Sequence, residues 1–285
     1  MLYSYDTLGY YNGKYDEIEK MSIPMNDRVC WFGDAVYDVT YCHNYNIYNL
    51  KEHMDRFFAS AAKLNIVIPN TYEEMCDLLT DTVKKLKSGD QMIYWQVSRG
   101  TASRNHVYSD NIKGNIWIML RPIPVKDTYT PIKAITVEDT RFFHCNIKTV
   151  NLIPNVLASQ RANMEGAEEA IFHRGDTVTE CAHSNVSILK DGVFITHPTD
   201  EYILAGIARS NLIRFCKQLG ISVEERAFTV EELFAADEVI VSSSGSFCIP
   251  VSHIDGKCVG GKDPRNLKRL QDTAVKDFLS ATEIN

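Results

Sequence analysis

Apolar residues in the first third of the chain recur with the spacing of amphipathic helices. One such helix is predicted over residues 51–64, and a capping box from Thr71 to Glu74 begins a second. Asn12-Gly13 is a two-residue turn signal between tyrosine-rich flanks, and it predicts a hairpin. The apolar positions are Met54, Phe57, Phe58, Ala61 and Leu64 in the first helix and Met75, Leu78, Leu79, Val83 and Leu86 in the second.

Short apolar runs predict strands elsewhere in the chain. In the first part these are residues 31–41, entered through Gly33 and Asp34, and residues 91–98 and 115–120. The second part is richer in strands, and Asp191-Gly192 predicts a tight turn within it. The strands expected there are 132–138, 168–174, 185–190, 193–197 and one that leads into a polar turn within 238–246. The helices expected there are 207–219 before Gly220, a short one from Thr229 and the tail from Arg265.

Three prolines mark the boundary between these two patterns. Pro122, Pro124 and Pro131 fall in a stretch without helical or strand periodicity, which is typical of a linker. We therefore predict an α/β (α+β) fold with two domains. The smaller N-terminal α/β domain spans 1–121, the linker 122–133, and the larger, strand-rich C-terminal domain 134–285 forms a pseudo-barrel.

Net charge, apolar run length and cysteine spacing disfavour several classes of function. The net charge of -7 over 285 residues disfavours nucleic-acid binding, and no apolar run is long enough to cross a membrane. The first residues lack the apolar core of a secretion signal, so we expect a cytoplasmic protein. The eight cysteines are widely and irregularly spaced, which predicts free thiols and no metal site.

The candidate chemistry centres on Lys148, which lies among apolar residues just before a predicted helix. A desolvated amine is more often neutral and can then attack a carbonyl. Glu180 offers a carboxylate in a strand-rich segment. By position alone, a solvated surface lysine is the commoner outcome.

Two further segments have the features of an anion site. Ile207 and Ala208 place backbone N–H groups at a helix start, and Ser243 and Ser244 place hydroxyls on a polar turn. Arg56 could add a fixed charge, although an ordinary pair with Glu52 would also account for it. An amine, a carboxylate and a phosphate cradle together suggest pyridoxal phosphate.

Two other function classes stay open at this point. Ser187 and Lys190 match the S-x-x-K spacing of serine acyl hydrolases, but they fall in a predicted strand and the partner motifs of that class are absent. A non-catalytic anion-binding protein would use the same phosphate-type turns without needing Lys148.

Longer motifs carry a resemblance to a known family. "CNIK" with "NLIPNVLA", "TVTE" with "SNV", and "FGDAVYDV" resemble the class IV (fold type IV) pyridoxal-phosphate aminotransferases, and the likeness runs through nearly the whole chain. "SRGTASRNH" is similar to the D-amino-acid branch of that family.

This resemblance implies a role for each matching residue. Lys148 would form the Schiff base and move protons, Glu180 would pair with the pyridine nitrogen, and Leu204 would pack under the ring. Tyr37, Arg104 and His106 would bind the substrate carboxylate, with Arg104 and His106 supplied by the neighbouring subunit of a homodimer with shared sites. The phosphate would be held by Arg56, Ile207, Ala208 and Ser244.

The implied reaction is a ping-pong transfer between a D-alanine-like amino acid and a 2-oxo acid such as 2-oxoglutarate. The same fold also serves L-branched-chain aminotransferases, (R)-amine transaminases and aminodeoxychorismate lyases. Departures from the family pattern are Ala208 and Ser244 in place of threonine, Cys181-Ala182-His183 in place of a serine-rich run, and Pro154 where a small residue is expected.

Overall fold

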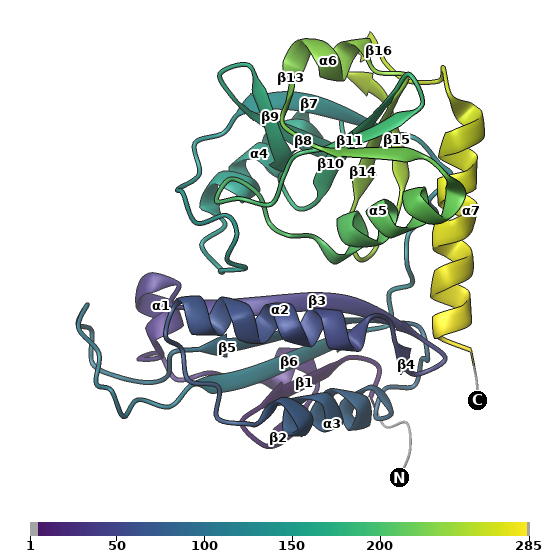
Figure 1. Ribbon diagram of the computed structural model, residues 1–285. Coiled ribbons are helices and arrows are strands. Elements are labelled where there is room, and N and C mark those ends of the chain that lie inside the picture. The colour runs from purple at the N-terminus through teal and green to yellow at the C-terminus, as the bar shows by residue number, and fades with distance from the viewer. Residues whose placement is uncertain (1–4, 284–285) are drawn as a thin grey trace. The chain divides into compact units, whose positions relative to one another are not determined.

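The computed structural model describes residues 5–283, and the chain divides into two compact units (Figure 1). The N-terminal unit comprises the chain up to Val125, Ile147–Asn151 and the end of the chain from Phe278. The C-terminal unit comprises Lys126–Asn146 and Leu152–Asp277. The predicted linker, 122–133, contains no helix or strand up to residue 131, and β7 (Ile132–Glu138) begins at its end.

The N-terminal unit is built on a six-stranded sheet in which every neighbouring pair is antiparallel. Its strand order is β2-β1-β6-β5-β3-β4. The predicted hairpin is confirmed, since Tyr11 pairs with Lys14 across Asn12-Gly13. The strands are β1 (Leu8–Tyr11), β2 (Lys14–Asp16), β3 (Ala35–His43), β4 (Asn46–Ile47), β5 (Gln91–Ser98) and β6 (Asn115–Arg121).

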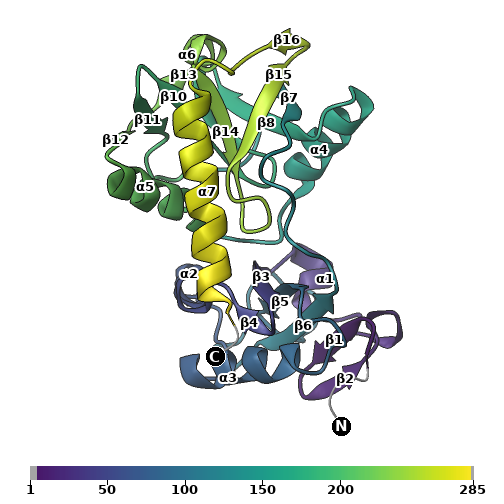
Figure 2. The same ribbon diagram turned by 90° about the vertical axis from the view of Figure 1, so that its right-hand side faces the viewer.

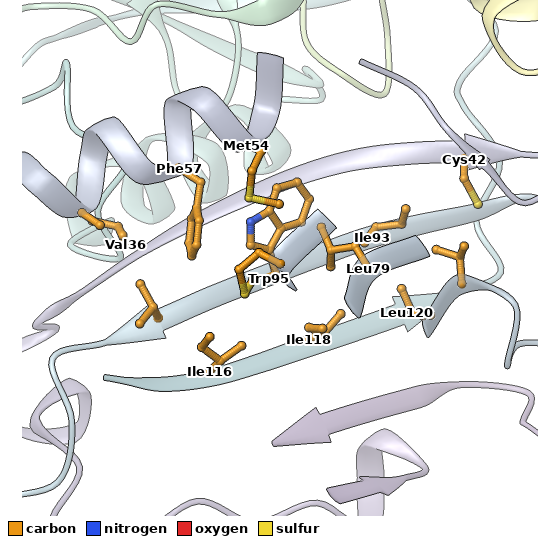
Figure 3. Packing of buried hydrophobic residues seen from close by; sticks show 14 of the residues in the cluster. Val36, Cys42, Met54, Phe57, Leu79, Ile93, Trp95, Ile116, Ile118 and Leu120 are labelled. Carbon is orange, nitrogen blue, oxygen red and sulfur yellow. The ribbon is translucent and has the colours of Figure 1, made fainter. Parts of the chain in front are cut away.

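Helices α2 (Leu50–Lys63) and α3 (Tyr72–Val83) supply apolar side chains to the core of this unit (Figure 3). Met54 and Phe57 of α2 and Leu79 of α3 surround Trp95 of β5, and all four are fully buried. The capping box that begins α3 is present as predicted. Burying such large apolar surfaces is the main stabilising term in a core of this kind.

One prediction in this unit is wrong. Trp31 and Phe32 were expected to begin a strand, but they end a short helix, α1 (Arg28–Phe32). The Asp27 side chain accepts a hydrogen bond from the Val29 N–H and begins this helix, and Gly33 in the left-handed conformation ends it. A 3-10 turn, η1 (Ile18–Lys20), completes the helical elements described in this unit.

The C-terminal unit is built on a ten-stranded sheet in the order β12-β11-β10-β14-β15-β7-β8-β9-β13, with β16 paired to β15. The helices of the unit cover its faces and ends (Figure 1). The strands are β7 (Ile132–Glu138), β8 (Glu169–Arg174), β9 (Thr177–Cys181), β10 (Asn185–Lys190), β11 (Val193–Thr196), β12 (Ser222–Glu225), β13 (Phe228–Thr229), β14 (Glu238–Ser242), β15 (Ile249–Ile254) and β16 (Lys257–Cys258).

The order of these strands requires the sheet to curl. β9 and β10 are five steps apart along the sheet, which would be about 24 Å in a flat sheet. Yet Cys181 and Asn185 are joined by four peptide links, which span at most about 15 Å. The sheet therefore bends round on itself, as the predicted pseudo-barrel requires.

Four helices belong wholly or mostly to this unit: α4 (Ile153–Met164), α5 (Ile207–Leu219), α6 (Val230–Ala235) and α7 (Pro264–Ala281). The bounds of α5 and its Gly220 cap are as predicted. Helix α7 lies beside α5 (Figure 2), where Arg269 Nη2 donates to the Leu219 carbonyl at 2.7 Å. An ion pair of 3.0 Å between Arg214 and Asp277 joins the same two helices.

The structure does not support a serine acyl hydrolase. Ser187 and Lys190 lie on β10, and residues three apart on a strand point to opposite faces. Ser187 is fully buried, whereas the Lys190 amine lies 3.4 Å from Asp237. Among residues 5–283, no helix combines the length and apolar character needed to cross a membrane.

Candidate cofactor site

The segment that carries Lys148 is docked along β3 of the N-terminal unit. The Tyr37 N–H donates to the Lys148 carbonyl at 3.0 Å, and the Val150 N–H donates to the Ala35 carbonyl at 3.3 Å. Between them Thr149 forms an antiparallel bridge with Val36. These contacts act on the backbone, so they fix the position of Lys148 whatever its side chain does.

The Lys148 amine lies over an aromatic side chain. Its Nζ is 4.4 Å from the centroid of the Tyr37 ring, and that ring stacks on Tyr94 with centroids 5.3 Å apart. The Lys148 backbone N–H also donates to Ser60 Oγ of α2 at 3.3 Å. Lys148 is half-buried and packed against an aromatic face, which is not the setting of an ordinary solvated lysine. The structure thus brings together Lys148 and Tyr37, two predicted site residues.

Arg56 is held by a buried carboxylate that sequence reasoning missed. Asp38 of β3 accepts from Arg56 Nε at 2.9 Å and from Arg56 Nη2 at 2.7 Å. The same carboxylate lies 2.8 Å from His53 Nδ1. The alternative pairing with Glu52 is therefore not the main contact of Arg56. A bidentate carboxylate fixes the plane of the guanidinium and so its direction.

This network sets the charge of its members. Burial by itself would raise the pKa of Asp38, but the charge of Arg56 and the hydrogen bonds from Arg56 and His53 hold the pKa of that carboxyl far below its ordinary range. Burial lowers the pKa of His53, and Asp38 only partly offsets this effect. Asp38 and Arg56 thus form a buried ion pair beside a largely neutral imidazole.

Glu180 occupies a comparable position in the C-terminal unit. It lies near the end of β9, is 5% exposed, and accepts from Arg141 Nη1 at 2.5 Å. Asn185 Nδ2 and the Leu204 N–H each donate to its other oxygen at 3.0 Å. The backbone of Leu204, a predicted ring contact, is therefore tied directly to the predicted partner of the pyridine nitrogen.

Arg141 was not recognised from the sequence. Its Nε and Nη2 donate to Asp139 at 3.0 and 2.9 Å, two residues away in the chain. Burial would lower the pKa of Arg141, but the hydrogen bonds to Asp139 and the charge of Glu180 raise it above the ordinary value. The D-x-R spacing was the only local signal for this pair.

Asn185 connects Glu180 with the start of α5. Its Nδ2 also donates to the Leu204 carbonyl at 3.0 Å, and a Cβ on Gly206 would lie 1.9 Å from its Oδ1. Glycine is therefore required where the chain enters α5. The first backbone N–H groups of that helix, at Ile207 and Ala208, have no partner within the helix because they precede its first repeat.

The predicted serine turn follows β14 in the same unit. Ser243 Oγ lies 2.6 Å from Ser246 Oγ, and the Ser246 N–H donates to the Ser243 carbonyl at 3.1 Å. The turn is thus tied by its own residues, and Ser243 and Ser244 are half-buried on it. Glu180, Leu204, Ile207, Ala208 and the two serines all belong to the C-terminal unit.

Arg104 and His106 lie on the loop between β5 and β6 of the N-terminal unit. Both are exposed, and both contact the ring of Phe32 on α1. Neither this contact nor the existence of α1 was apparent from the sequence.

The structure accounts for two of the departures from the family pattern. Pro154 lies in the first turn of α4, where its missing N–H has no helical partner to lose. Cys181 is buried, and burial raises the pKa of its thiol well above the ordinary value. The Ala182 carbonyl accepts from Asn155 at 2.7 Å, while the exposed side chain of His183 lies 3.2 Å from Glu169.

The available groups fit pyridoxal phosphate. The C-terminal unit provides a buried, oriented carboxylate, an uncapped helix start and serine hydroxyls, which suit a ring nitrogen and a phosphate. The N-terminal unit provides an amine and an oriented guanidinium, which suit an aldehyde and an anion. Among the described residues there is no cluster of three or more His, Cys, Asp or Glu that could hold a metal, and all eight cysteines are free.

Comparisons with known proteins point to one family. A family model described as amino-transferase class IV matches residues 35–254. A D-alanine aminotransferase of Listeria monocytogenes (strain 10403S) is 42% identical over 271 residues, covering 93% of this chain and 94% of that protein. A D-alanine aminotransferase of Bacillus licheniformis is 36% identical over 271 residues, covering 94% and 96%.

Solved structures show the same fold at lower sequence identity. The branched-chain amino acid aminotransferase of Escherichia coli has a TM-score of 0.88 at 23% identity, covering 97% of this chain and 96% of that one. A putative 4-amino-4-deoxychorismate lyase of Legionella pneumophila has a TM-score of 0.82 at 21% identity, covering 91% and 97%. The predicted fold type IV is thereby confirmed.

The burial of His53 predicts how stability depends on pH. Because burial lowers the pKa of His53 below that of an unfolded histidine, about 6.5, folding favours the neutral ring. That contribution is present above pH ~6.5 and is lost as the pH falls through the folded pKa. The free energy of unfolding, measured by urea titration, should therefore fall less between pH 7 and pH 5 in His53→Gln than in the wild type. His144→Gln, at an exposed site, is the control and should keep the wild-type slope. Equal slopes for His53→Gln and the wild type would contradict this account.

Proposed function

Because the chain belongs to the class IV aminotransferases, whose cofactor is pyridoxal 5′-phosphate, we propose that it transfers the amino group of a D-alanine-like D-amino acid to a 2-oxo acid. The observation that carries this proposal is the 42% identity to a D-alanine aminotransferase along nearly the whole chain. The docked segment with Lys148 against Tyr37 supports the same conclusion from the structure.

Lys148 is proposed to hold the cofactor covalently and then to move the proton of the substrate α-carbon. Its Nζ can take up a proton from that carbon and deliver it again, because an amine serves as base and acid in turn. The backbone contacts of Tyr37 and Val150 keep the Lys148 backbone in one place during this exchange. When bound, pyridoxal phosphate supplies an electron sink for the substrate carbon.

Glu180 is proposed to accept a hydrogen bond from the protonated ring nitrogen of the cofactor. Arg141, Asn185 and the Leu204 N–H hold its two oxygens, so the carboxylate cannot turn away. A fixed carboxylate at the ring nitrogen favours its protonated form, which strengthens the electron sink. Leu204 is proposed to pack under the ring.

The phosphate is proposed to be bound by a helix start, hydroxyls and one guanidinium. The N–H groups of Ile207 and Ala208 carry the positive end of the α5 dipole. Because these would be backbone contacts, alanine in place of threonine at position 208 removes a hydroxyl but leaves the N–H. Ser243 and Ser244 would add hydroxyls, and Asp38 would orient the guanidinium of Arg56.

The substrate carboxylate is proposed to be bound by Tyr37, Arg104 and His106. An arginine matches a carboxylate in charge and geometry, and histidine and tyrosine can each donate one more hydrogen bond. A carboxylate-binding group of this kind suits amino acids better than plain amines, which disfavours an (R)-amine transaminase.

A homodimer with shared sites is proposed as the working form. Helix α4 carries apolar side chains that are largely exposed in the single chain, and such a face is typical of a protein interface. They follow a helical spacing that places them on one side of α4. These residues are Ile153 (71% exposed), Val156 (58%), Leu157 (66%) and Met164 (78%). A cytoplasmic location stays a prediction, and the free state of all eight cysteines supports it.

Comparing amino donors of different configuration and chemical class distinguishes the four activities considered for this fold. With 2-oxoglutarate as acceptor, D-alanine should turn over at least ~100-fold faster than (R)-1-phenylethylamine, which lacks the carboxylate, since a lost polar substrate contact costs orders of magnitude. L-leucine keeps the carboxylate but has the opposite configuration at the α-carbon, so that its α-hydrogen points away from the amine that removes it from D-alanine, and it should be slower by a similar factor. Pyruvate release from aminodeoxychorismate without an acceptor should not be detectable. Turnover of L-leucine without turnover of D-alanine would show that the chain is a branched-chain enzyme.

The α4 face predicts the effect of a charged substitution on assembly. Leu157→Glu should place a charge in the interface, convert a dimer at micromolar concentration largely to monomer in sedimentation velocity, and lower activity in parallel. Gln218→Glu introduces the same charge at an exposed polar position of α5, outside the α4 face, and should leave the dimer intact. A Leu157→Glu protein that remains dimeric and fully active would exclude α4 from the interface.

A further inference from the structure

The loop between β5 and β6 is tied to α1 where it begins. The Arg28 N–H donates to the Gly100 carbonyl at 2.9 Å, and the Ala102 N–H donates to the Asn26 carbonyl at 3.0 Å. Asp27 and Thr101 form an antiparallel bridge between these two bonds. The residues that lead into α1 and those that lead into the loop therefore run side by side.

The side chain of Arg28 reaches further along the loop. Its Nη1 donates to the Asn105 carbonyl at 2.6 Å and its Nη2 to the His106 carbonyl at 3.4 Å. Arg28 is 3% exposed, and its Nε donates to Asp34 at 2.8 Å, so the guanidinium is itself fixed. Charge-assisted bonds of this kind are stronger than neutral ones. The backbone at His106 is thus held from inside the unit.

The loop is held again beyond His106. The ring of Tyr108 lies 3.8 Å from the guanidinium carbon of Arg99 and 5.6 Å from that of Arg28. Arg99 Nε donates to the same Asp34 oxygen as Arg28, also at 2.8 Å. The two arginines share the Asp34 carboxylate and the Tyr108 ring, and these contacts anchor the loop just after His106.

Between these anchors, Arg104 and His106 meet on a single aromatic side chain. The His106 ring centroid is 5.0 Å from that of Phe32, and the Arg104 guanidinium carbon is 5.5 Å from the Phe32 centroid. A guanidinium packed against a ring keeps its N–H donors available at its edges. Without the ring, two exposed side chains on an irregular loop would sample many rotamers.

We propose that α1 is the positioning element of the carboxylate-binding group, with Phe32 as the surface on which Arg104 and His106 are held together and Arg28 as the anchor of their backbone. This inference rests on the proposed function, because it takes Arg104 and His106 to bind the substrate carboxylate. Phe32 does not touch the substrate; it lowers the cost of bringing the guanidinium of Arg104 and the ring of His106 into one geometry. Its contribution is to the affinity for the carboxylate and not to the proton transfer at Lys148.

The test uses the holoenzyme with Phe32→Leu, which removes the ring, and Phe32→Tyr, which keeps it. Propionate is the probe, since it has a carboxylate and no amino group to react, and its Kd is measured by calorimetry. KM and kcat for D-alanine, the cofactor absorbance and the Tm are measured alongside. Trp31→Leu, at the exposed neighbouring position on α1, is the matched control.

Phe32→Leu should raise the Kd of propionate and the KM of D-alanine by ~3- to 10-fold, the size expected for loss of ring–cation contacts, with kcat within about twofold of the wild type. Phe32→Tyr and Trp31→Leu should keep wild-type values. The proposal is overturned if Phe32→Leu leaves the propionate Kd at the wild-type value, whether or not kcat and Tm fall. It is also overturned if Phe32→Tyr is as impaired in propionate binding as Phe32→Leu.

Failure of the proposed function would look different. A wild-type holoenzyme that binds propionate but does not turn over D-alanine would contradict the proposed reaction, while the Kd comparison between Phe32→Leu and Phe32→Tyr would still decide the role of Phe32. Tyr108→Leu gives an independent check, because losing the ring over Arg99 should raise the propionate Kd in the same direction.

Discussion

The backbone pairing of residues 147–151 with β3 is the constraint on which the account depends. Three consecutive residues of β3, Ala35 to Tyr37, bind this short segment through two hydrogen bonds and a bridge. Because the segment is not part of a helix or strand, this pairing, together with the bond from the Lys148 N–H to Ser60 Oγ, places the Lys148 backbone. It also places Lys148 in the N-terminal unit, although the residues on either side belong to the C-terminal one.

β3 supplies the groups that contact both Lys148 and Arg56. Tyr37 packs against the Lys148 amine, while its neighbour Asp38 is fully buried and orients Arg56. Alternation along the strand explains this division, since adjacent residues point to opposite faces. Breaking the Asp38–Arg56 pair would leave a buried charge without its partner, an effect that typically costs about 3–5 kcal/mol. We therefore expect few substitutions to be tolerated at Tyr37 or Asp38.

Local patterns were enough to predict the elements with strong periodicity or clear end signals. Helix α5 and its glycine cap, the capping box of α3 and the Asn12-Gly13 hairpin each depend on residues close together in the chain. The strand expected from Trp31 failed for a local reason as well. Its apolar residues gave no sign of the Asp27 cap and the left-handed Gly33 that make this stretch a helix.

The partners of the site residues could not be predicted, because the sheets and not the local sequence bring them together. Asp38 and Arg56 are 18 positions apart, Arg141 and Glu180 are 39 apart, and Arg28 reaches the Asn105 carbonyl across 77. A motif can name the residue that carries the chemistry, such as Lys148 or Glu180. It does not reveal the buried group that holds that residue in place.

Reduction of the holoenzyme with sodium borohydride, followed by peptide mapping, tests the central claim most directly. A lysine that holds the cofactor is fixed to it by reduction, and only the peptide containing Lys148 should carry the added mass. Control protein that has been stripped of cofactor should carry none. Stoichiometric labelling of any other lysine, or no labelling of a protein that binds the cofactor and turns over D-alanine, would contradict the assignment of Lys148.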